Sequence, residues 1–407
     1  MRNALRIRDF RLLFAGQAVS AVGDQVFPVA VSVLVLDTGG GAADLGIVLA
    51  ARFAALVLFA LLGGVWADRL PRVRVLVSAD LLRLAAVLGL LVATSVSTVP
   101  LPVLAGLVFL VGAGEAFFRP AYGALLPSVL PPPSLAAGNA LSASSAQLAQ
   151  VVGPGLGGLL MAAAGARAGF VLDATTFAIS LVTLLRVREP EHLPAPRTRV
   201  VAEMAEGIRA VRERPWIAWL LGVFALNLML VYAPVVILLP LMVREQTGET
   251  ASYGYVLAAG AFGGLIGALV AGRWKGPARG RWATLGLALL VAQPVALLLG
   301  AGLPVLCVAW AIAGLGLGPF IVQWETALQA DVPRHLLARV ISLDWMATFG
   351  LFPLGLALTG PAVAAFGRSG VLALGVVIAV VLPLLVLRVP GVREFRTPVT
   401  GPGSASG

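Results

Sequence analysis

Long apolar runs follow one another along almost the whole chain, and short polar connections separate them. Each run has roughly 20 mostly apolar residues, which a helix needs to cross the hydrocarbon core of a bilayer. We predict twelve such helices, over residues 12–36, 44–66, 75–95, 101–121, 138–163, 168–186, 216–238, 253–273, 283–300, 304–323, 339–360 and 369–388. The pattern therefore predicts an all-α integral membrane protein.

One long polar stretch, from Arg186 to Pro215, interrupts this pattern and divides the predicted helices into six and six. Its second part, Val200 to Arg214, has the pattern of an amphipathic helix that lies on the membrane surface, and a solvated linker is the alternative. The predicted division is an N-terminal six-helix bundle over 1–186, a cytoplasmic linker over 187–215, a C-terminal six-helix bundle over 216–388 and a cytoplasmic tail over 389–407.

The two halves share a sequence pattern. "GIVLAAR", which starts at Gly46, matches "GYVLAAG", which starts at Gly254, and each opens the second helix of its half. Duplicated bundles of membrane helices are typical of secondary transporters, in which the substrate site lies near mid-membrane between the repeats. We therefore expect two pseudo-symmetric six-helix bundles with a cavity between them.

Composition and charge agree with this fold. Hydrophobic residues make up 59% of the 407 residues and charged residues 12%, which is about half the charged share of a soluble protein. The formal charge of +10 comes mainly from arginines in alternate connections, beginning with the N-terminus. This asymmetry predicts that both termini are cytoplasmic, and it explains the basic excess without nucleic acid.

A short charged loop, "GGVWADRLPRVRVL", joins the second and third predicted helices. Its residues Gly64, Asp68, Arg69, Arg72 and Arg74 resemble the signature loop of the major facilitator superfamily. The resemblance implies a cytoplasmic latch that docks on the opposite half, and Arg119 is expected to join its network. A positive-inside anchor is the alternative for the arginines. The candidate acceptors for the latch arginines are Glu325, Asp331 and Asp344.

Three further stretches resemble the branch of this superfamily that holds macrolide efflux proteins and the enterobactin exporter. They begin at Arg8 ("RDFRLLFAGQ"), Phe117 ("FFRPAYGALLP") and Gly153 ("GPGLGGLL"). The third resembles the motif of drug/proton antiporters. Pro154 frees a backbone carbonyl and favours a bend, and small neighbours allow close helix packing. The expected helix-bending motif consists of Gly153, Pro154, Gly155, Gly157 and Gly158.

Ionisable side chains within the apolar runs are functional candidates, because a charge in hydrocarbon is costly. Asp24 and Arg52 lie at similar depth in the first and second helices, so we expect them to pair, either as a proton switch or as a permanent structural pair. Glu115 in the fourth helix is expected to pair with Arg83. Asp173 in the sixth helix is a weaker candidate. The predicted proton-coupling residues are Asp24, Arg52 and Glu115.

Polar side chains are sparse in the helices that would line the cavity. The first helix carries one polar stripe at helical spacing, which includes Gln17 and Ser20. The other candidates are Gln147 and Gln150 in the fifth helix, Asn227 and Tyr232 in the seventh, and Gln293 in the ninth. A mostly apolar pocket with a few polar groups suits amphipathic organic molecules.

These features together predict a secondary active exporter of amphipathic small molecules, such as a drug, an antibiotic or a siderophore-like metabolite. It would exchange them for protons by alternating access, as a monomer among the lipids of a bacterial cell membrane. A lipid or lysophospholipid flippase on the same scaffold is the alternative. A membrane-embedded enzyme is disfavoured, since the chain has no H-E-x-x-H, cysteine cluster or nucleophile elbow, and we expect neither a metal nor a cofactor.

Overall fold

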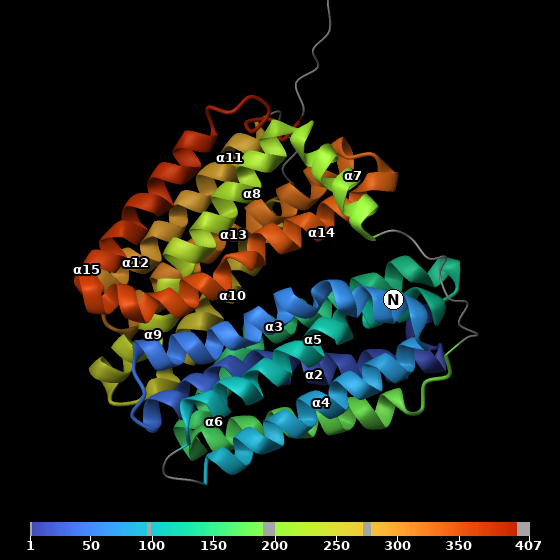
Figure 1. The fold of residues 1–407 in the computed structure, drawn as a ribbon, viewed down its shortest axis with the longest axis horizontal. Helices are drawn as coiled ribbons and strands as arrows, with labels where there is room; N and C mark the ends of the chain where they lie inside the picture. The colour runs from blue at the N-terminus through green and yellow to red at the C-terminus, as the bar shows by residue number, and fades with distance from the viewer. Residues whose placement is uncertain (1, 96–98, 190–199, 272–277, 397–407) are drawn as a thin grey trace, which may run out of the picture.

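The structure is a computed structural model that describes residues 2–95, 99–189, 200–271 and 278–396, and these ranges contain helices and no strand. Figure 1 shows two bundles of helices, one above the other. The first bundle contains α1 (Arg2–Leu5), α2 (Arg8–Asp37), α3 (Ala42–Arg69), α4 (Arg72–Ala93), α5 (Leu101–Ser128) and α6 (Pro132–Leu184). It corresponds to the predicted N-terminal half.

The second bundle follows the linker helix α7 (Val200–Arg212). Several of its helices are interrupted by a short π or 3-10 turn, which leaves more and shorter elements than in the first bundle. These elements are α8 (Pro215–Asn227), η1 (Leu228–Tyr232), α9 (Ala233–Thr247), η2 (Thr250–Ser252), α10 (Tyr253–Ala271), α11 (Arg279–Leu287), η3 (Ala288–Val291), α12 (Ala292–Leu298), α13 (Leu303–Asp331), α14 (Arg334–Gly350) and α15 (Phe352–Val386).

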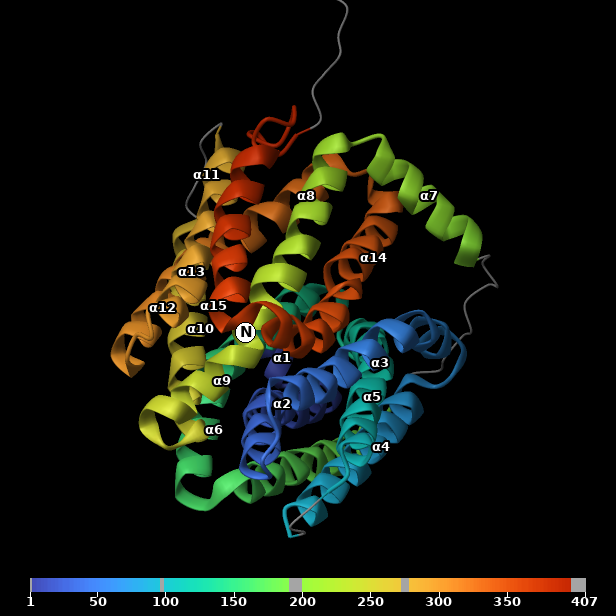
Figure 2. The ribbon, with the colours of Figure 1, turned by 60° about the vertical axis from the view of Figure 1, so that its left-hand side comes forward.

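Among the described residues, ten segments are long and apolar enough to cross a membrane. Two of them are too long for one crossing, since the 53 residues of α6 would make a straight helix about 80 Å long. A glycine with positive φ breaks each, Gly165 at 68° in α6 and Gly367 at 72° in α15, and Figure 2 shows α6 changing direction. Both breaks fall between two predicted helices, so each of these two segments corresponds to two of the predicted crossings. This supports the prediction of twelve crossings, and the lengths and compositions of the segments alone do not establish that number.

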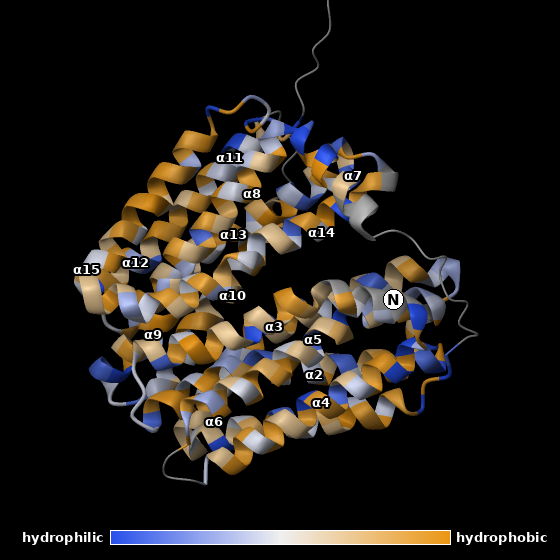
Figure 3. Cartoon of the chain, viewed as in Figure 1, coloured by the Kyte–Doolittle hydropathy of each residue, from blue (hydrophilic) through white to orange (hydrophobic). Residues whose placement is uncertain are grey.

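Hydrophobic residues predominate along the helices of both bundles, and hydrophilic residues are most frequent near the helix ends and connections (Figure 3). Large apolar side chains such as Leu88, Val92 and Val377 are exposed. A soluble protein rarely exposes contiguous apolar surface on this scale. The surface is therefore the one expected of a protein that spans a membrane.

The two bundles share a core on only one side of the molecule. There α3 packs on α15 and α6 packs on α10, and one hydrophobic cluster contains residues of both bundles, from Phe27 and Phe170 to Ile237 and Phe352. Two smaller clusters each belong to a single bundle. We call the first region the joined side and the other end, where α1 and α7 lie, the open side, toward which the bundles diverge in Figure 1.

Cross-bundle bonds accompany the shared core on the joined side. The hydroxyl of Tyr253 donates to the carbonyl of Pro28 over 3.1 Å. Arg244 donates to the carbonyl of Leu36, and its guanidinium lies 3.7 Å from the carboxylate of Asp37. The joined side is therefore closed by polar bonds as well as by apolar packing.

The linker segment from Val200 forms helix α7, which packs on α14 and α8 of the second bundle. Glu206 pairs with Arg339 of α14, and the side chain of Ala210 is buried in the core of that bundle. The segment is thus helical and attached to one bundle. Its position on a membrane surface stays a prediction.

Candidate functional site

A cavity of about 810 Å³ lies between the two bundles. Helices α2, α3 and α5, with Pro154 of α6, form one wall, and η1, α9, α10, α13, α14 and α15 form the other. Its lining reaches from Tyr253 near the joined side to Tyr122 and Ile341 toward the open side. A site built from both repeats is the arrangement that secondary transporters use for their substrates.

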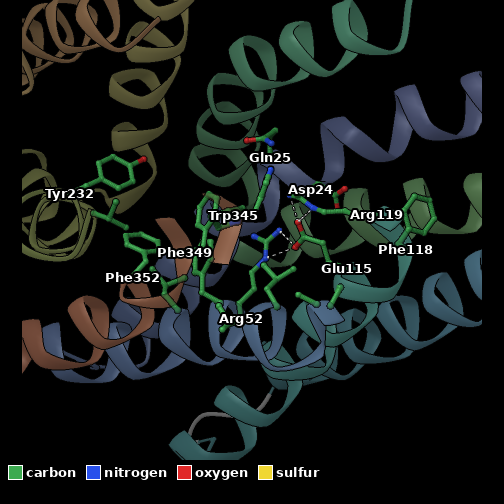
Figure 4. Close-up of a pocket in the computed structure, with 18 of the residues that line it drawn as sticks. Asp24, Gln25, Arg52, Glu115, Phe118, Arg119, Tyr232, Trp345, Phe349 and Phe352 are labelled. Carbon is green, nitrogen blue, oxygen red and sulfur yellow. Dashed lines mark hydrogen bonds and ion pairs between the residues drawn. The ribbon is translucent and has the colours of Figure 1, made fainter. Parts of the chain in front are cut away.

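Glu115 on α5 is held by two arginines in the cavity wall (Figure 4). Its Oε2 accepts from Arg52 Nη2 at 2.9 Å and Nε at 3.2 Å, and its Oε1 accepts from Arg119 Nε at 3.0 Å. Arg52 and Glu115 are buried, whereas the side chain of Arg119 is 54% exposed. Because Arg119 follows Glu115 by one helical turn, only Arg52 ties this carboxylate to another helix.

A second ionic network lies deeper in the first bundle. Arg83 Nη1 lies 3.6 Å from Asp24 Oδ1 at the cavity edge, and Arg83 Nη2 donates to Asp80. Ser180 Oγ donates to the other oxygen of Asp80 over 2.6 Å. The guanidinium also lies against an aromatic ring, 4.3 Å from the centroid of Phe118. Arg83 is thus almost fully buried with its charge compensated.

The predicted ion pairs, Asp24 with Arg52 and Glu115 with Arg83, are wrong. Both arginines approach α5, and two glycines decide which face each one reaches. A Cβ on Gly112 would lie 2.2 Å from the carbonyl oxygen of Arg52, and one on Gly114 would lie 2.5 Å from Cγ of Arg83. Glu115 lies about 60° around α5 from Gly112 but about 100° from Gly114. Depth along the helices was similar for all four residues, and the helix faces determined the partners.

Among the predicted cavity residues, Gln17 and Tyr232 line this cavity, as do the three proton-coupling candidates Asp24, Arg52 and Glu115. The other predicted residues do not line it. Ser20, Asn227 and Gln293 are buried, and Gln147 and Gln150 are exposed outside the lining. A substrate role for these five residues stays a prediction.

An aromatic wall, which the sequence analysis missed, crosses from one bundle to the other. Trp345 stacks on Phe349 with centroids 4.9 Å apart, and Phe349 stacks on Phe53 of the first bundle at 6.3 Å. Phe352 lies 4.7 Å from Phe53 and 5.8 Å from Tyr232. The stretch "WMATFGLF" carried the signal, because its aromatic residues recur at i, i+4 and i+7 on one helix face.

Arg119 lies against this wall in the structure, and its place in the latch network stays a prediction. Its guanidinium lies 5.3 Å from the ring centroid of Trp345, and it also bonds to Glu115. Figure 4 shows it between α5 and the aromatic side chains of the second bundle. The cavity therefore presents one half-exposed cation next to its largest aromatic surface.

The loop between α3 and α4 bonds within the first bundle. The N–H groups of Arg72 and Val73 donate to the carboxylate of Glu189, at 2.8 and 3.0 Å, so Glu189 caps the start of α4. Arg69 and Arg74 are exposed. For the remaining latch candidates, the surroundings of Gly64 and the side chain of Asp68 lie outside the described part of the structure.

The expected acceptors of the latch lie in the second bundle. Asp331 accepts from Trp216 Nε1 at 3.1 Å and Asp344 accepts from Trp324 Nε1 at 3.3 Å, whereas Glu325 is exposed. All of these groups lie toward the open side, where the bundles have separate cores. Docking of the latch therefore stays a prediction for a state in which the bundles meet on that side.

The glycine motif of α6 forms a contact between the bundles. A Cβ on Gly254 of α10 would lie 2.4 Å from the carbonyl oxygen of Pro154, and one on Gly158 would lie 2.8 Å from the carbonyl oxygen of Ala251. Gly153 instead packs on Gln25 of α2. The backbone break of α6 falls at Gly165, so Pro154 lies within the helical first arm. The motif's role in bending stays a prediction.

Comparison with known proteins agrees with this architecture. The profile of the Major Facilitator Superfamily matches residues 13–351. The chain belongs to the major facilitator superfamily. Members of this superfamily are transporters, so the chain is a multi-pass membrane transporter and not an enzyme.

Several relatives in this superfamily match nearly the whole chain. The multidrug efflux pump Tap of Mycobacterium tuberculosis is 33% identical over 97% of this chain and 96% of its own. Macrolide efflux protein A of Streptococcus pyogenes is 27% identical, over 86% and 88%. The enterobactin exporter EntS of Shigella boydii is 27% identical, over 95% and 93%. These matches confirm the predicted branch of the superfamily.

Solved structures share the fold at low sequence identity. A bacterial homolog of the human lysosomal transporter Spinster, in an inward-facing and unoccupied conformation, has a TM-score of 0.76 and 17% identity, over 96% of this chain and 98% of its own. A bacterial homologue of the iron transporter ferroportin, in an inward-facing state, has a TM-score of 0.73 and 18% identity, over 94% and 98%. At these identities, the two structures support the assignment of the fold and say nothing about the substrate.

Proposed function

We propose that this chain exports amphipathic small molecules from a bacterial cell, in exchange for protons, by alternating access. The cavity of about 810 Å³ between two bundles that are joined on one side only is the observation that carries this proposal. Its size falls within the range of pockets that enclose drug-sized molecules, about 300–1,000 Å³. The efflux pumps among the relatives support the direction of transport.

The lining suits molecules with an apolar body and a few polar groups. The aromatic wall from Trp345 to Tyr232 offers flat apolar surface to such a body. Arg119 and Asp24 offer a cation and an anion at the edge of the first bundle. A sugar would leave most of its hydroxyl groups without partners on these apolar and aromatic surfaces.

The direction of opening follows from the arginines. The connections on the open side carry most of the basic residues, such as Arg69, Arg74 and Arg188, and basic connections face the cytoplasm. On this basis both termini are cytoplasmic and the structure is open to the cytoplasm. Export then requires the joined side to separate and the open side to close, with the loop between α3 and α4 docking on the second bundle as a latch.

Asp24 is the group proposed to exchange protons with the cavity. Its side chain is 23% exposed, and its one ion pair is long, at 3.6 Å to Arg83. Glu115 is buried and held by two arginines at shorter distances, so its proton exchange needs two ion pairs to break. We therefore assign the proton to Asp24 and a bracing role to Arg52 with Glu115, which tie α3 to α5.

Inverted membrane vesicles from an efflux-deficient host test the proposal. Ethidium and erythromycin, added separately as probes, are each expected to be taken up and to dissipate an imposed proton gradient. Vesicles that contain Asp24→Asn protein are the control and should do neither. Uptake with an undisturbed proton gradient would contradict antiport, and the absence of uptake of both probes would contradict drug export.

A lipid or lysophospholipid flippase is the second candidate, and one observation favours it. An apolar groove of about 540 Å³ lies on the second bundle between η1 and α15. Its lining includes Met229 and the exposed side chains of Leu358 and Phe366, which suit an acyl chain. A fluorescent lysophospholipid in the same vesicles separates the two candidates, because a flippase would move this lipid and leave ethidium and erythromycin behind.

A further inference from the structure

One acidic side chain in the first bundle has no partner in the site described above. Asp173, on the second arm of α6, is 0% exposed, and neither of its carboxylate oxygens has a hydrogen-bond partner among the described residues. A buried carboxylate without a cation or donor is strongly disfavoured in a protein interior. Its presence inside a membrane bundle therefore calls for a compensating charge or a proton.

Among the described residues, no free cation lies near Asp173. The charged groups that interact with it electrostatically are Asp24 on α2, Arg52 on α3, and Asp80 with Arg83 on α4. Arg52 is bonded to Glu115, and Arg83 lies between Asp80 and Asp24. Both arginines are thus engaged with other carboxylates.

The charge cluster of the first bundle has one more acid than it has arginines. The acids are Asp24, Asp80, Glu115 and Asp173, and the arginines are the buried Arg52 and Arg83 and the half-exposed Arg119. Each arginine contacts at least one of the first three acids, so the excess negative charge remains with Asp173. One proton bound in this cluster makes it electroneutral.

Helix α2 links Asp173 to the cavity. A Cβ on Gly23 would lie 2.5 Å from Asp173 Oδ1 and 2.3 Å from Thr176 Oγ1, so only glycine allows α2 to pack this closely on the carboxyl group. The next residue, Asp24, lines the cavity. The buried carboxyl therefore contacts α2 at Gly23, the residue next to the acid to which we assign proton exchange.

We propose that Asp173 is a second proton-binding group of this transporter, which exchanges its proton with the cavity through Asp24. This inference rests on the proposed proton antiport. While Asp24 is a carboxylate paired with Arg83, Asp173 keeps the single proton of the cluster. When Asp24 leaves Arg83, the proton passes from Asp173 to Asp24 and from Asp24 to the cavity, so the total charge of the cluster falls by one. One proton taken up through Asp24 from the other side of the membrane then returns to Asp173 and closes the cycle.

Infrared spectroscopy of the full-length protein in lipid nanodiscs tests this directly, with carbon-13 in its aspartates. The wild type should show a carbonyl band of a protonated aspartate in neutral buffer, and alkaline buffer should remove it. Asp173→Asn should lose this band. Asp173→Ser, which has a smaller side chain, should lose it too and can be measured if Asp173→Asn does not fold. Thr176→Val is the matched control, one turn away, and should keep it. A full band in either Asp173 variant would overturn the proposal.

The route through Asp24 has its own readout in the same samples. In deuterated buffer the band of Asp173 should exchange more slowly in Asp24→Asn than in the wild type, because the neighbouring acid no longer relays the proton. An unchanged exchange rate would overturn the proposed route.

Proteoliposomes separate this inference from the proposed function. With ethidium as the probe, Asp173→Asn should still exchange external for internal ethidium but should no longer move protons with it. Wild-type ethidium transport without proton movement would refute the antiport, and the infrared band would still decide whether Asp173 binds a proton. Full proton movement in Asp173→Asn would refute its role in coupling.

Discussion

At the scale of single residues, the cavity depends on charges that are held in fixed pairs inside a membrane bundle. Arg52 is buried, and its guanidinium makes two bonds to Glu115. Its ring neighbour Phe27 lies 5.2 Å from the guanidinium and offers no compensating charge. The pairing of Arg52 with Glu115, and not with Asp24, therefore has consequences for stability that can be measured.

Arg52→Ala should lower the free energy of unfolding by about 3 kcal/mol, the lower end of the cost of breaking a buried ion pair, because Arg119 still bonds to Glu115. Adding Glu115→Gln should recover a large part of this loss, since no unpaired carboxylate then remains. Equilibrium unfolding in mixed detergent micelles measures both values. Adding Asp24→Asn instead is the matched control. Recovery of stability by that change would support a pair between Arg52 and Asp24, as predicted from the sequence, instead of the pair with Glu115.

Asp24→Asn tests the proton exchange itself. The amide keeps the size of the side chain but cannot release a proton, so substrate-driven proton movement should fall to the background of protein-free vesicles. Ethidium binding to the purified protein, measured by fluorescence, should persist because the aromatic wall is unchanged. Normal proton movement in the variant would remove Asp24 from the coupling mechanism.

At the scale of the elements, helix ends close the joined side. The last carbonyl groups of α2 lack partners within the helix and carry the negative end of its dipole. Arg244 of α9 donates to one of them, at Leu36, which also accepts from the N–H of Gly39, and it lies near Asp37. Arg368 lies on the same side of the molecule, but it bonds to Glu245 of its own bundle at 2.6 Å. The two arginines therefore form a matched pair for experiment.

Arg244→Gln should shift the protein toward opening of the joined side. The side chain of Arg244 is 40% exposed, so solvent screens the interaction, and we expect a shift of about 1 kcal/mol, or roughly fivefold in population. Spin labels at positions 38 and 246, in a Cys307→Ser background, would report a larger share of long distances. Arg368→Gln should leave the distances unchanged, and an equal effect of both variants would argue against a cross-bundle role for Arg244.

At the scale of the whole molecule, the two bundles behave as separate bodies with one shared contact. They have a common core on the joined side and separate cores on the open side. Since each bundle has its own core, a rocking motion breaks only the shared contact. This division is what the proposed alternating access requires.

A disulfide across the joined side should stop transport. A Cβ on Gly155 of α6 would lie 3.4 Å from Cβ of Ala258 on α10, close to the separation that a disulfide requires. Oxidised Gly155→Cys/Ala258→Cys protein, in a Cys307→Ser background, should bind ethidium but lose its transport, and a reductant should restore transport. Each single variant is a control. Transport by fully crosslinked protein would show that the bundles do not separate at this contact.

The sequence by itself determined the features that depend on position along the chain. Hydropathy located the helices, and the breaks at Gly165 and Gly367 fall where two predicted helices meet. The charged loop after the second helix and the glycine motif at Gly153 indicated the superfamily that the comparison confirmed. These signals are local, since each rests on residue types within one helix or one loop.

Only the tertiary structure decided which side chains meet. Arg52, Arg83, Asp24 and Glu115 lie at similar depths, so their pairing depended on which faces of the helices pack together, and close approach at glycines such as Gly112 set those faces. The aromatic wall and the joined side likewise require contacts between residues that are distant in sequence. The physical reason is that hydropathy reports how deep a residue lies in the membrane, whereas the direction it faces is set by the helices packed around it.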